Sequence, residues 1–251
     1  MTIFIGIYVT LLGLVLGSFY NVVGLRIPEG ESIVRPPSQC PQCGTVLRHR
    51  DLIPIVSYLL SAARCRHCRA RISLQYPLVE AATALLFLWV YIRFGLTGEG
   101  IMGFILVSLA VIITVTDCKF MLIPNKVLLF FLPLLFIMRL VCPLDTGWNH
   151  LLGAVVGGGV ILLIMFLSRG GMGMGDVKLF ILFGWVVGFP QVILAFIIAC
   201  TLGSMVGGLL LLLGVIRRKQ PIPFGPWLAI GTLVSYGYGQ QIISGYLSLI
   251  R

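Results

Sequence analysis

Long runs of apolar residues constrain this chain most strongly, because they recur along almost its whole length. A helix that rises about 1.5 Å per residue needs roughly 20 mainly apolar residues to cross the hydrocarbon layer of a bilayer. Charged residues make up only 10% of the sequence, too few to cover a water-exposed surface. The sequence therefore predicts an all-α polytopic membrane protein with about eight transmembrane helices, at residues 3–24, 76–92, 101–116, 121–141, 151–167, 177–188, 192–215 and 227–247.

The distribution of lysine and arginine predicts the orientation of the chain, because loops rich in these residues stay on the cytoplasmic side of a membrane. With the N-terminus outside, all basic residues except Arg93, Arg139 and Arg251 fall in cytoplasmic segments. Topology and attraction to anionic lipid headgroups then explain the formal net charge of +10. We therefore expect contact with the lipid bilayer and no nucleic-acid partner.

A polar insert, residues 25–75, separates the first apolar run from the second. It holds two Cys-x2-Cys pairs separated by 21 residues, the arrangement of a tetrahedral structural zinc site: Cys40, Cys43, Cys65 and Cys68. Two disulfides are the alternative, but a cytoplasmic insert lies in a reducing compartment. We expect Zn²⁺ here and three parts in the chain: a first transmembrane helix (1–24), a cytoplasmic zinc-binding insert (25–75) and a transmembrane core (76–251).

Two aspartates at the ends of apolar runs are candidates for catalysis, because a carboxylate at a membrane boundary usually has a function. Asp117 follows the run 101–116, and Asp176 follows Gly173 and Gly175, which allow close approach of the backbone. If the two carboxyls lie close together, one holds a proton while the other activates water, and the pair titrates as a unit. This predicts a membrane aspartyl protease with neither residue assigned as the acid. The alternative is two solvated loop residues, each beside a lysine.

Seven segments, in order along nearly the whole chain, resemble those of bacterial prepilin peptidases, the type IV leader peptidases. They are Gly17–Val23, the two cysteine pairs, Asp51–Pro54, Tyr76–Glu80, Asp117 with Ile123–Asn125, Met172–Lys178 and Ile222–Pro226. The resemblance implies a GxGD-type aspartyl protease whose catalytic pair is Asp117 and Asp176. Gly173, Gly175 and Lys178 belong to the supporting motif.

The resemblance also implies a substrate and a second activity. The substrate would be a type IV prepilin or a type II secretion pseudopilin, cut on the cytoplasmic side of the bacterial inner membrane. Many family members also methylate the new N-terminal amine with S-adenosylmethionine, and those members carry the cysteine insert that this chain resembles. Glu80, the acidic residue at the start of the second run, is a candidate for handling this amine. A glutamate paired with a nearby arginine is the alternative.

Two other classes of protein stay open at this point. An ion-coupled carrier would use the two membrane-edge aspartates to bind cations. A noncatalytic pilin-assembly factor would bind pilin helices through its membrane face, and its aspartates would not be needed for processing.

Overall fold

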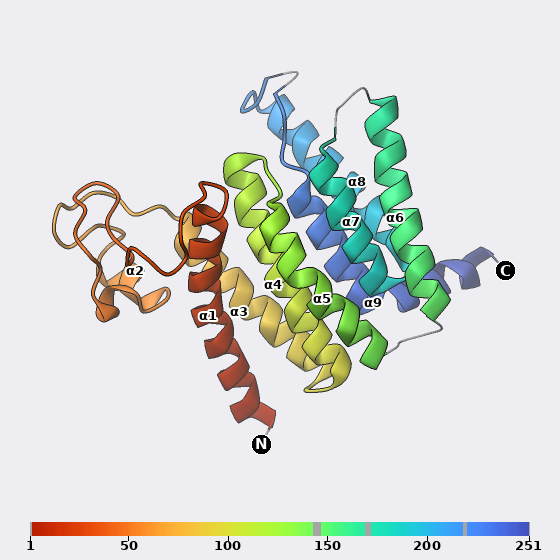
Figure 1. Ribbon diagram of the computed structural model, residues 1–251, viewed down its shortest axis with the longest axis horizontal. Coiled ribbons are helices and arrows are strands. Elements are labelled where there is room, and N and C mark those ends of the chain that lie inside the picture. Colours follow the sequence, from red (N-terminus) through yellow and green to blue (C-terminus); the bar gives the residue numbers. More distant parts are fainter. Residues whose placement is uncertain (1, 143–146, 169–171, 218–219, 251) are drawn as a thin grey trace. The chain divides into compact units, whose positions relative to one another are not determined.

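A computed structural model of the chain describes residues 2–142, 147–168, 172–217 and 220–250. Apart from two isolated β-bridges, every regular element in these ranges is a helix, so the prediction of an all-α protein is confirmed. Arg169, Arg218, Lys219 and Arg251, which enter the orientation argument, lie outside the described residues. A helix occupies each of the eight apolar runs (Figure 1): α1 (Thr2–Arg26), α3 (Gln75–Phe94), α4 (Gly98–Phe120), α5 (Asn125–Val141), α6 (Gly147–Leu167), α7 (Met174–Val187), α8 (Gln191–Leu212) and α9 (Gly225–Ile250).

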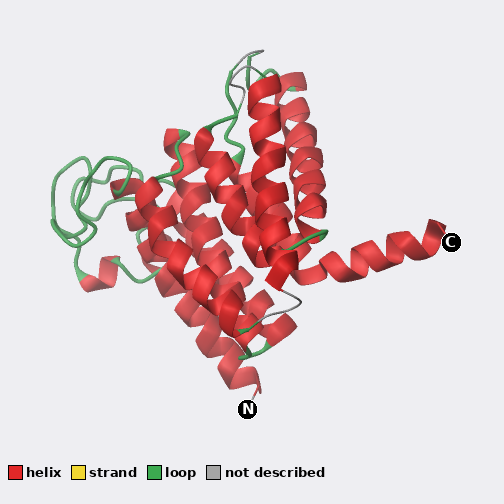
Figure 2. Ribbon diagram, turned by 45° about the vertical axis from the view of Figure 1, so that its right-hand side comes forward, coloured by secondary structure: helices red, strands yellow, loops and turns green. Residues whose placement is uncertain are grey.

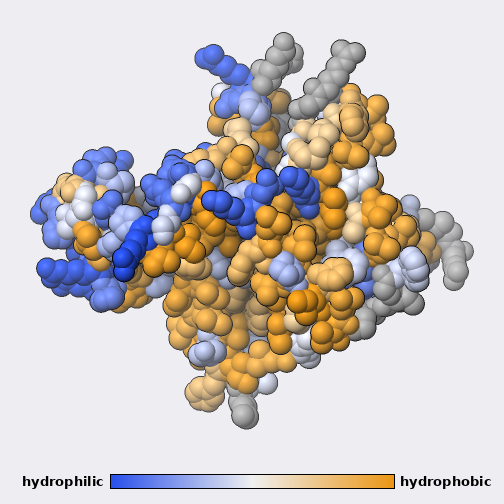
Figure 3. Space-filling model, viewed as in Figure 1, coloured by the Kyte–Doolittle hydropathy of each residue, from blue (hydrophilic) through white to orange (hydrophobic). Residues whose placement is uncertain are grey.

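Five of the described helices are long and apolar enough to cross a membrane: α1, α3, α4, α8 and the Trp148–Leu167 part of α6. Large apolar side chains cover the outsides of the helices, whereas hydrophilic residues gather over the insert (Figure 3). Such exposed apolar surface is unfavourable in water and favourable in lipid. The chain is therefore a multi-pass membrane protein. The helices α5 and α7 are shorter, with 17 and 14 residues.

The boundary between the third and fourth apolar runs differs from the prediction. Helix α4 does not end at Thr116 but continues to Phe120, so Asp117 lies within its last turn. Met121 then ends the helix in a left-handed conformation (φ 52°), and α5 begins at Asn125, directly after Pro124. A polar residue at the end of an apolar run does not stop a helix, whereas the turn at Met121 and the proline do.

The chain divides into two compact units, Met1–Leu96 and Thr97–Arg251. In the first unit, α1 and α3 pack against each other in antiparallel directions, because Gly6, Gly13 and Gly17 of α1 face progressively earlier residues of α3. A Cβ atom on Gly13 would lie 2.7 Å from Ala84 Cα, and one on Gly17 would lie 2.8 Å from Glu80 Cα. The two glycines therefore allow the helix backbones to approach closely.

The insert between α1 and α3 contains little regular structure: the 3-10 helix η1 (His49–Asp51), the short α2 (Val56–Leu60) and two antiparallel β-bridges. Its bridges pair Gln39 with Val46 and Arg64 with Arg71, and each closes a loop that holds one cysteine pair. Such a segment buries few apolar side chains, so a bound metal is an expected source of order.

In the second unit, α4 is the most deeply buried of the candidate membrane spans and packs against α5 and α9. Helices α6 and α7 form a close pair in which Gly153 lies against the backbone of Gly184. Gly157 and Gly158 also face α7, at Phe180 and Ile181, so they too allow close packing of the two helices. The C-terminal part of α9 extends away from the other helices of this unit, and its Leu249 is 85% exposed (Figure 2).

A buried ion pair joins four helices of the second unit. Arg139 of α5 is 2% exposed, and its Nη1 lies 2.7 Å from Glu99 Oε1 at the start of α4. Its Nη2 donates to the carbonyl of Val186 in the last turn of α7, at 2.6 Å. Tyr236 of α9 donates to the Glu99 carboxylate at 2.8 Å. Since Glu99 and Asp117 lie near opposite ends of α4, this cluster is at the other end of the unit from the aspartates.

Candidate functional site

Asp117 is buried near the C-terminal end of α4, with 6% of its surface exposed. Its Oδ2 accepts a hydrogen bond from the backbone N–H of Gly225, at 2.8 Å, and the backbone of Phe224 donates as well. Gly225 is the first residue of α9, where backbone N–H groups have no partner within the helix. The start of α9 therefore supplies donors that hold this carboxylate.

Asp176 is the third residue of α7 and is half-buried. Its Oδ2 accepts the backbone N–H of Gly173 at 3.1 Å, which caps the start of the helix. Gly175 is needed for packing, because a Cβ atom there would lie 2.9 Å from Ile123 Cβ in the loop between α4 and α5. At Gly173 we expected close approach of the backbone, and the structure differs. A Cβ atom there would have Asp176 Oδ2 as its nearest neighbour, at 3.5 Å, so close packing does not require a glycine at this position.

The two aspartates lie at the same end of the second unit. Gly175 packs on the loop that follows Asp117, and Lys178 Nζ donates to Asn125 Oδ1 at 3.0 Å. Asp176 precedes the apolar run that begins at Val177 and so lies outside the membrane-spanning segment. Burial raises its pKa to about 6, the N–H of Gly173 opposes this rise, and the negative charge of Asp117 adds to it.

The interpretation of both aspartates as solvated residues beside a lysine does not fit this geometry. Asp117 is almost fully buried, and Lys178 donates to Asn125. Within the described ranges, neither carboxylate forms an ion pair with a lysine. Two carboxyls at the same end of the unit, with the pKa of Asp176 raised, are the groups that acid–base chemistry on one substrate would need.

The four cysteines of the insert come together in the first unit. Their Sγ atoms all lie within 4.8 Å of one another, so they could hold a metal ion. Each pair lies on a tight loop: the Gly44 N–H donates to the Cys40 carbonyl at 2.9 Å, and the Arg69 N–H donates to the Cys65 carbonyl, also at 2.9 Å. Cys40 Sγ and Cys68 Sγ are 3.8 Å apart, and tetrahedral zinc thiolates place sulfurs about 3.8 Å apart. All four are free thiols in the structure, so the two-disulfide alternative is not seen.

Glu80 lies on α3 in the first unit and is 6% exposed. Its Oε2 accepts the backbone N–H of Ile55 at 2.7 Å, and the Ser18 side chain also forms a hydrogen bond with it. The alternative of an arginine partner is not seen, because no ion pair of the described residues includes Glu80. Glu80 lies in the first unit, whereas Asp117 and Asp176 lie in the second.

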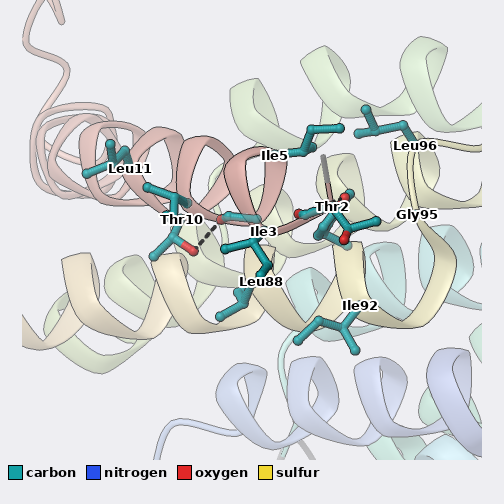
Figure 4. Close-up of a pocket in the computed structure, with 12 residues that line it drawn as sticks. Thr2, Ile3, Ile5, Thr10, Leu11, Leu88, Ile92, Gly95 and Leu96 are labelled. Atoms are coloured by element: carbon teal, nitrogen blue, oxygen red, sulfur yellow. Dashed lines mark hydrogen bonds between the residues drawn. The ribbon is translucent and has the colours of Figure 1, made fainter.

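A cavity of about 820 Å³ opens in the first unit between the start of α1 and the end of α3 (Figure 4). Apolar side chains such as Leu11, Leu88 and Ile92 line most of it. Thr10 faces it, but the Thr10 hydroxyl is already bonded to the Gly6 carbonyl at 2.7 Å. Glu80 and the cysteines do not line this cavity, so it is separate from the candidate sites.

The sequence did not predict the donors that hold Asp117. Phe224 and Gly225 are about 108 residues away along the chain, and their motif carries no chemically active side chain. The available signal was the position of Ile222–Pro226 directly before an apolar run, because a helix N-terminus stabilises a nearby anion.

Comparison with known proteins gives two family matches. Residues 11–94 match the bacterial peptidase A24 N-terminal domain, and residues 104–208 match the type IV leader peptidase family. The boundary between these matches falls near the division between the two structural units. No solved structure matches the chain.

Several curated relatives match over most of the chain, and each is named prepilin leader peptidase/N-methyltransferase. The relative from Bacillus subtilis is 43% identical over 237 residues, which cover 94% of this chain and 96% of the relative. The relative from Pseudomonas aeruginosa is 34% identical over 94% of this chain and 91% of the relative. The relative from Myxococcus xanthus is 37% identical over 82% of this chain and 63% of the relative.

Proposed function

Because the chain belongs to the type IV leader peptidase family, we propose that it removes the leader from prepilins or pseudopilins and then methylates the new N-terminus. The relatives carry both activities in their name and match this chain across both structural units. The observation that carries the peptidase proposal is the placement of Asp117 and Asp176 at one end of the second unit, with Asp117 held by the start of α9.

In the proposed cleavage, Asp117 and Asp176 share one proton. The ionised carboxylate takes a proton from a water molecule, which attacks the carbonyl carbon of the peptide bond after the leader. The protonated carboxyl donates its proton to the leaving nitrogen as the C–N bond breaks, and the proton taken from water stays on the other carboxyl, so the pair again holds one proton. Gly225 positions Asp117, Gly173 caps the turn that holds Asp176, and Gly175 lets this turn lie on Ile123. Lys178 fixes the same turn to Asn125.

We assign zinc to the four-cysteine cluster of Cys40, Cys43, Cys65 and Cys68. Four thiolates fill a tetrahedral site completely, so the ion would be structural and would order the insert. The methyl donor is S-adenosylmethionine, which supplies an activated methyl group on a sulfonium. We place the methyl-transfer chemistry in the first unit, with Glu80 as the residue that handles the amine.

The cellular setting follows from charge and from the family. We propose a bacterial inner-membrane location in which the insert (25–75) and the catalytic end of the core (76–251) face the cytoplasm, and residues 1–24 form the first transmembrane helix. The basic residues of the insert and the lysines around the aspartates favour this orientation. The partners are then the pilin substrates and the lipid bilayer, with no nucleic acid.

The intact mass of a type IV prepilin co-expressed with this chain tests the proposal. We expect wild type to remove the leader mass and add one methyl increment, and Asp117→Asn and Asp176→Asn to leave the prepilin uncut. Glu29→Gln, which removes an exposed carboxylate from the insert, is the matched control and should behave as wild type.

Two outcomes contradict the peptidase assignment. Cleavage by both aspartate variants would favour the noncatalytic assembly factor, with another protease doing the cutting. If wild type leaves the prepilin uncut, an ion-coupled carrier that binds cations through the two carboxylates becomes the better explanation of their placement.

A further inference from the structure

Two buried polar side chains, Asn21 of α1 and Glu80 of α3, lie in neighbouring turns of the interface between these helices. Asn21 is 0% exposed and Glu80 is 6% exposed. Gly17 brings the two helices together here, because a Cβ atom on it would lie 2.8 Å from Glu80 Cα. Asn21 lies one turn after Gly17, and its Nδ2 reaches the carbonyl of Tyr76, one turn before Glu80. Both side chains are therefore at the same end of the helix pair.

The amide of Asn21 has an oxygen that lacks a donor. Its Nδ2 donates to two backbone carbonyls, those of Gly17 and Tyr76, each at 3.3 Å. Since both neighbours are acceptors, the amide nitrogen must face them and the oxygen must face away. Oδ1 has no hydrogen-bond partner among the residues that the structure describes. A buried acceptor of this kind needs a donor from a ligand or from water.

Among the residues that the structure describes, Glu80 has neutral hydrogen-bond donors and forms no ion pair. The Ile55 N–H and the Ser18 side chain are its hydrogen-bond partners. Ile55 adopts φ 60° and ψ −50°, a backbone conformation that a β-branched residue rarely takes. Strained backbone of this kind is often kept at functional sites, and here it directs an N–H at the carboxylate. A buried carboxylate surrounded only by neutral donors lacks the compensating charge that such groups usually have.

We propose that Asn21 and Glu80 bind a primary ammonium group, the N-terminus of a pilin from which the leader has been removed. An ammonium has three N–H donors and a positive charge, so it can satisfy both Asn21 Oδ1 and the Glu80 carboxylate. This site rests on the proposed methyl transfer and names the residues that recognise its acceptor.

The geometry gives Glu80 a chemical role as well as a binding role. The bound ammonium transfers one proton to the carboxylate of Glu80, which leaves a neutral amine with a free electron pair. That pair forms the N–CH₃ bond while the S–CH₃ bond of the sulfonium donor breaks, so the positive charge moves from sulfur to nitrogen and a neutral thioether leaves. Glu80 then returns its proton to water. Asn21 touches the same nitrogen and orients it.

Peptide binding to the purified full chain in detergent tests the site without a methyl donor. The probes are a synthetic peptide with the N-terminal sequence of a mature pilin and the same peptide with an acetylated N-terminus. We expect wild type to bind the free-amine peptide roughly tenfold more tightly than the acetylated peptide, as a charge-assisted hydrogen bond allows.

Glu80→Gln should bind both peptides equally, and Asn21→Leu should reduce the preference for the free amine. Glu29→Gln should keep it. Equal binding of both peptides by wild type, or an unchanged preference in Glu80→Gln, would overturn the proposal.

The co-expressed prepilin gives a second readout that separates this site from the peptidase. With Glu80→Gln and Asn21→Leu we expect a pilin that has lost its leader and carries no methyl increment. Retained cleavage then shows that these variants fold. Normal methylation by Glu80→Gln would overturn the amine site and leave the peptidase standing. Loss of cleavage together with methylation in both variants would also overturn it, since the residues would then support folding. If wild type fails to cut the prepilin, the proposed function fails, and the peptide measurement still decides the amine site.

Discussion

At the residue scale, Gly225 leaves no room for a side chain beside Asp117. A Cβ atom there would lie 2.9 Å from Asp117 Oδ2, the atom that accepts the Gly225 N–H. Gly225→Ala should therefore displace the carboxylate and slow leader cleavage by roughly 100-fold, because catalysis is sensitive to misplacement of about 1 Å. The measurement is the cleavage rate of a prepilin by the purified chain in detergent.

Another glycine of the same helix supplies the control. Gly245 has nothing within 4 Å of its would-be Cβ atom, so Gly245→Ala should cleave at the wild-type rate. Equal rates for Gly225→Ala and Gly245→Ala would show that the start of α9 does not position Asp117.

The raised pKa of Asp176 predicts how stability depends on pH. Burial raises this pKa from 3.8 to about 6, so the folded chain holds a proton that the unfolded chain has already lost. The stability that this proton gives the folded chain is fully present at low pH. It is lost as the pH rises through about 6, where the buried carboxyl of Asp176 ionises. Asp176→Asn carries no such charge. It should unfold at a higher temperature than wild type well above pH 6, and the difference should shrink well below it.

Thermal unfolding of both chains over a pH series makes this measurement. Glu29→Gln, at an exposed position, should follow the wild-type curve. A constant difference between Asp176→Asn and wild type across the series would mean that Asp176 does not titrate in this range.

At the scale of elements, the proposed zinc ion would join the two cysteine loops to each other. We expect about one zinc ion per chain in the wild type, because four thiolates complete one tetrahedral site. Cys43→Ser should lose most of this zinc and make residues 27–74 susceptible to added protease, since little else orders the insert. Metal analysis and limited proteolysis test this. Cys118→Ser, which changes an exposed cysteine outside the cluster, should keep the zinc. Wild-type zinc content in Cys43→Ser would contradict the assignment.

The ion pair of Arg139 and Glu99 fixes the ends of α4, α5 and α7. Arg139 is in the last turn of α5 and contacts the last turn of α7, and the C-terminal end of a helix favours a positive charge. Glu99 is in the first turn of α4, and the N-terminal end of a helix favours a negative charge. Arg139→Leu should lower the free energy of unfolding by about 3–5 kcal/mol, because it leaves a carboxylate without its partner. Replacing both residues with leucine should recover part of the loss. Unfolding in detergent measures both, and an unchanged stability of Arg139→Leu would refute the argument.

The positions of the helices were predictable because an apolar run of sufficient length has few alternatives in a membrane. Helix ends were less predictable: α4 passes through Asp117 and stops at Met121, where the backbone turns left-handed. The clustering of the four cysteines followed from their spacing. The contacts of Gly225 with Asp117, of Ile55 with Glu80 and of Arg139 with Val186 could not be predicted, since each joins residues far apart in the sequence through a backbone atom.

At the scale of the whole molecule, the candidate residues fall in two units. The aspartates lie in Thr97–Arg251, and the cysteines, Asn21 and Glu80 lie in Met1–Leu96. Each unit buries its own polar groups within its own helices, as Asn21 and Glu80 do between α1 and α3. The family matches, 11–94 and 104–208, follow the same division.

If the proposed functions are divided in the same way, two defective copies should compensate for each other. A chain with Asp176→Asn keeps an intact first unit, and a chain with Glu80→Gln keeps an intact second unit. Expressed together in one membrane, they should yield a pilin that is both shortened and methylated, although neither does so alone. The intermediate would pass from one copy to the other by lateral diffusion, so the two reactions need not occur during a single encounter with one enzyme molecule.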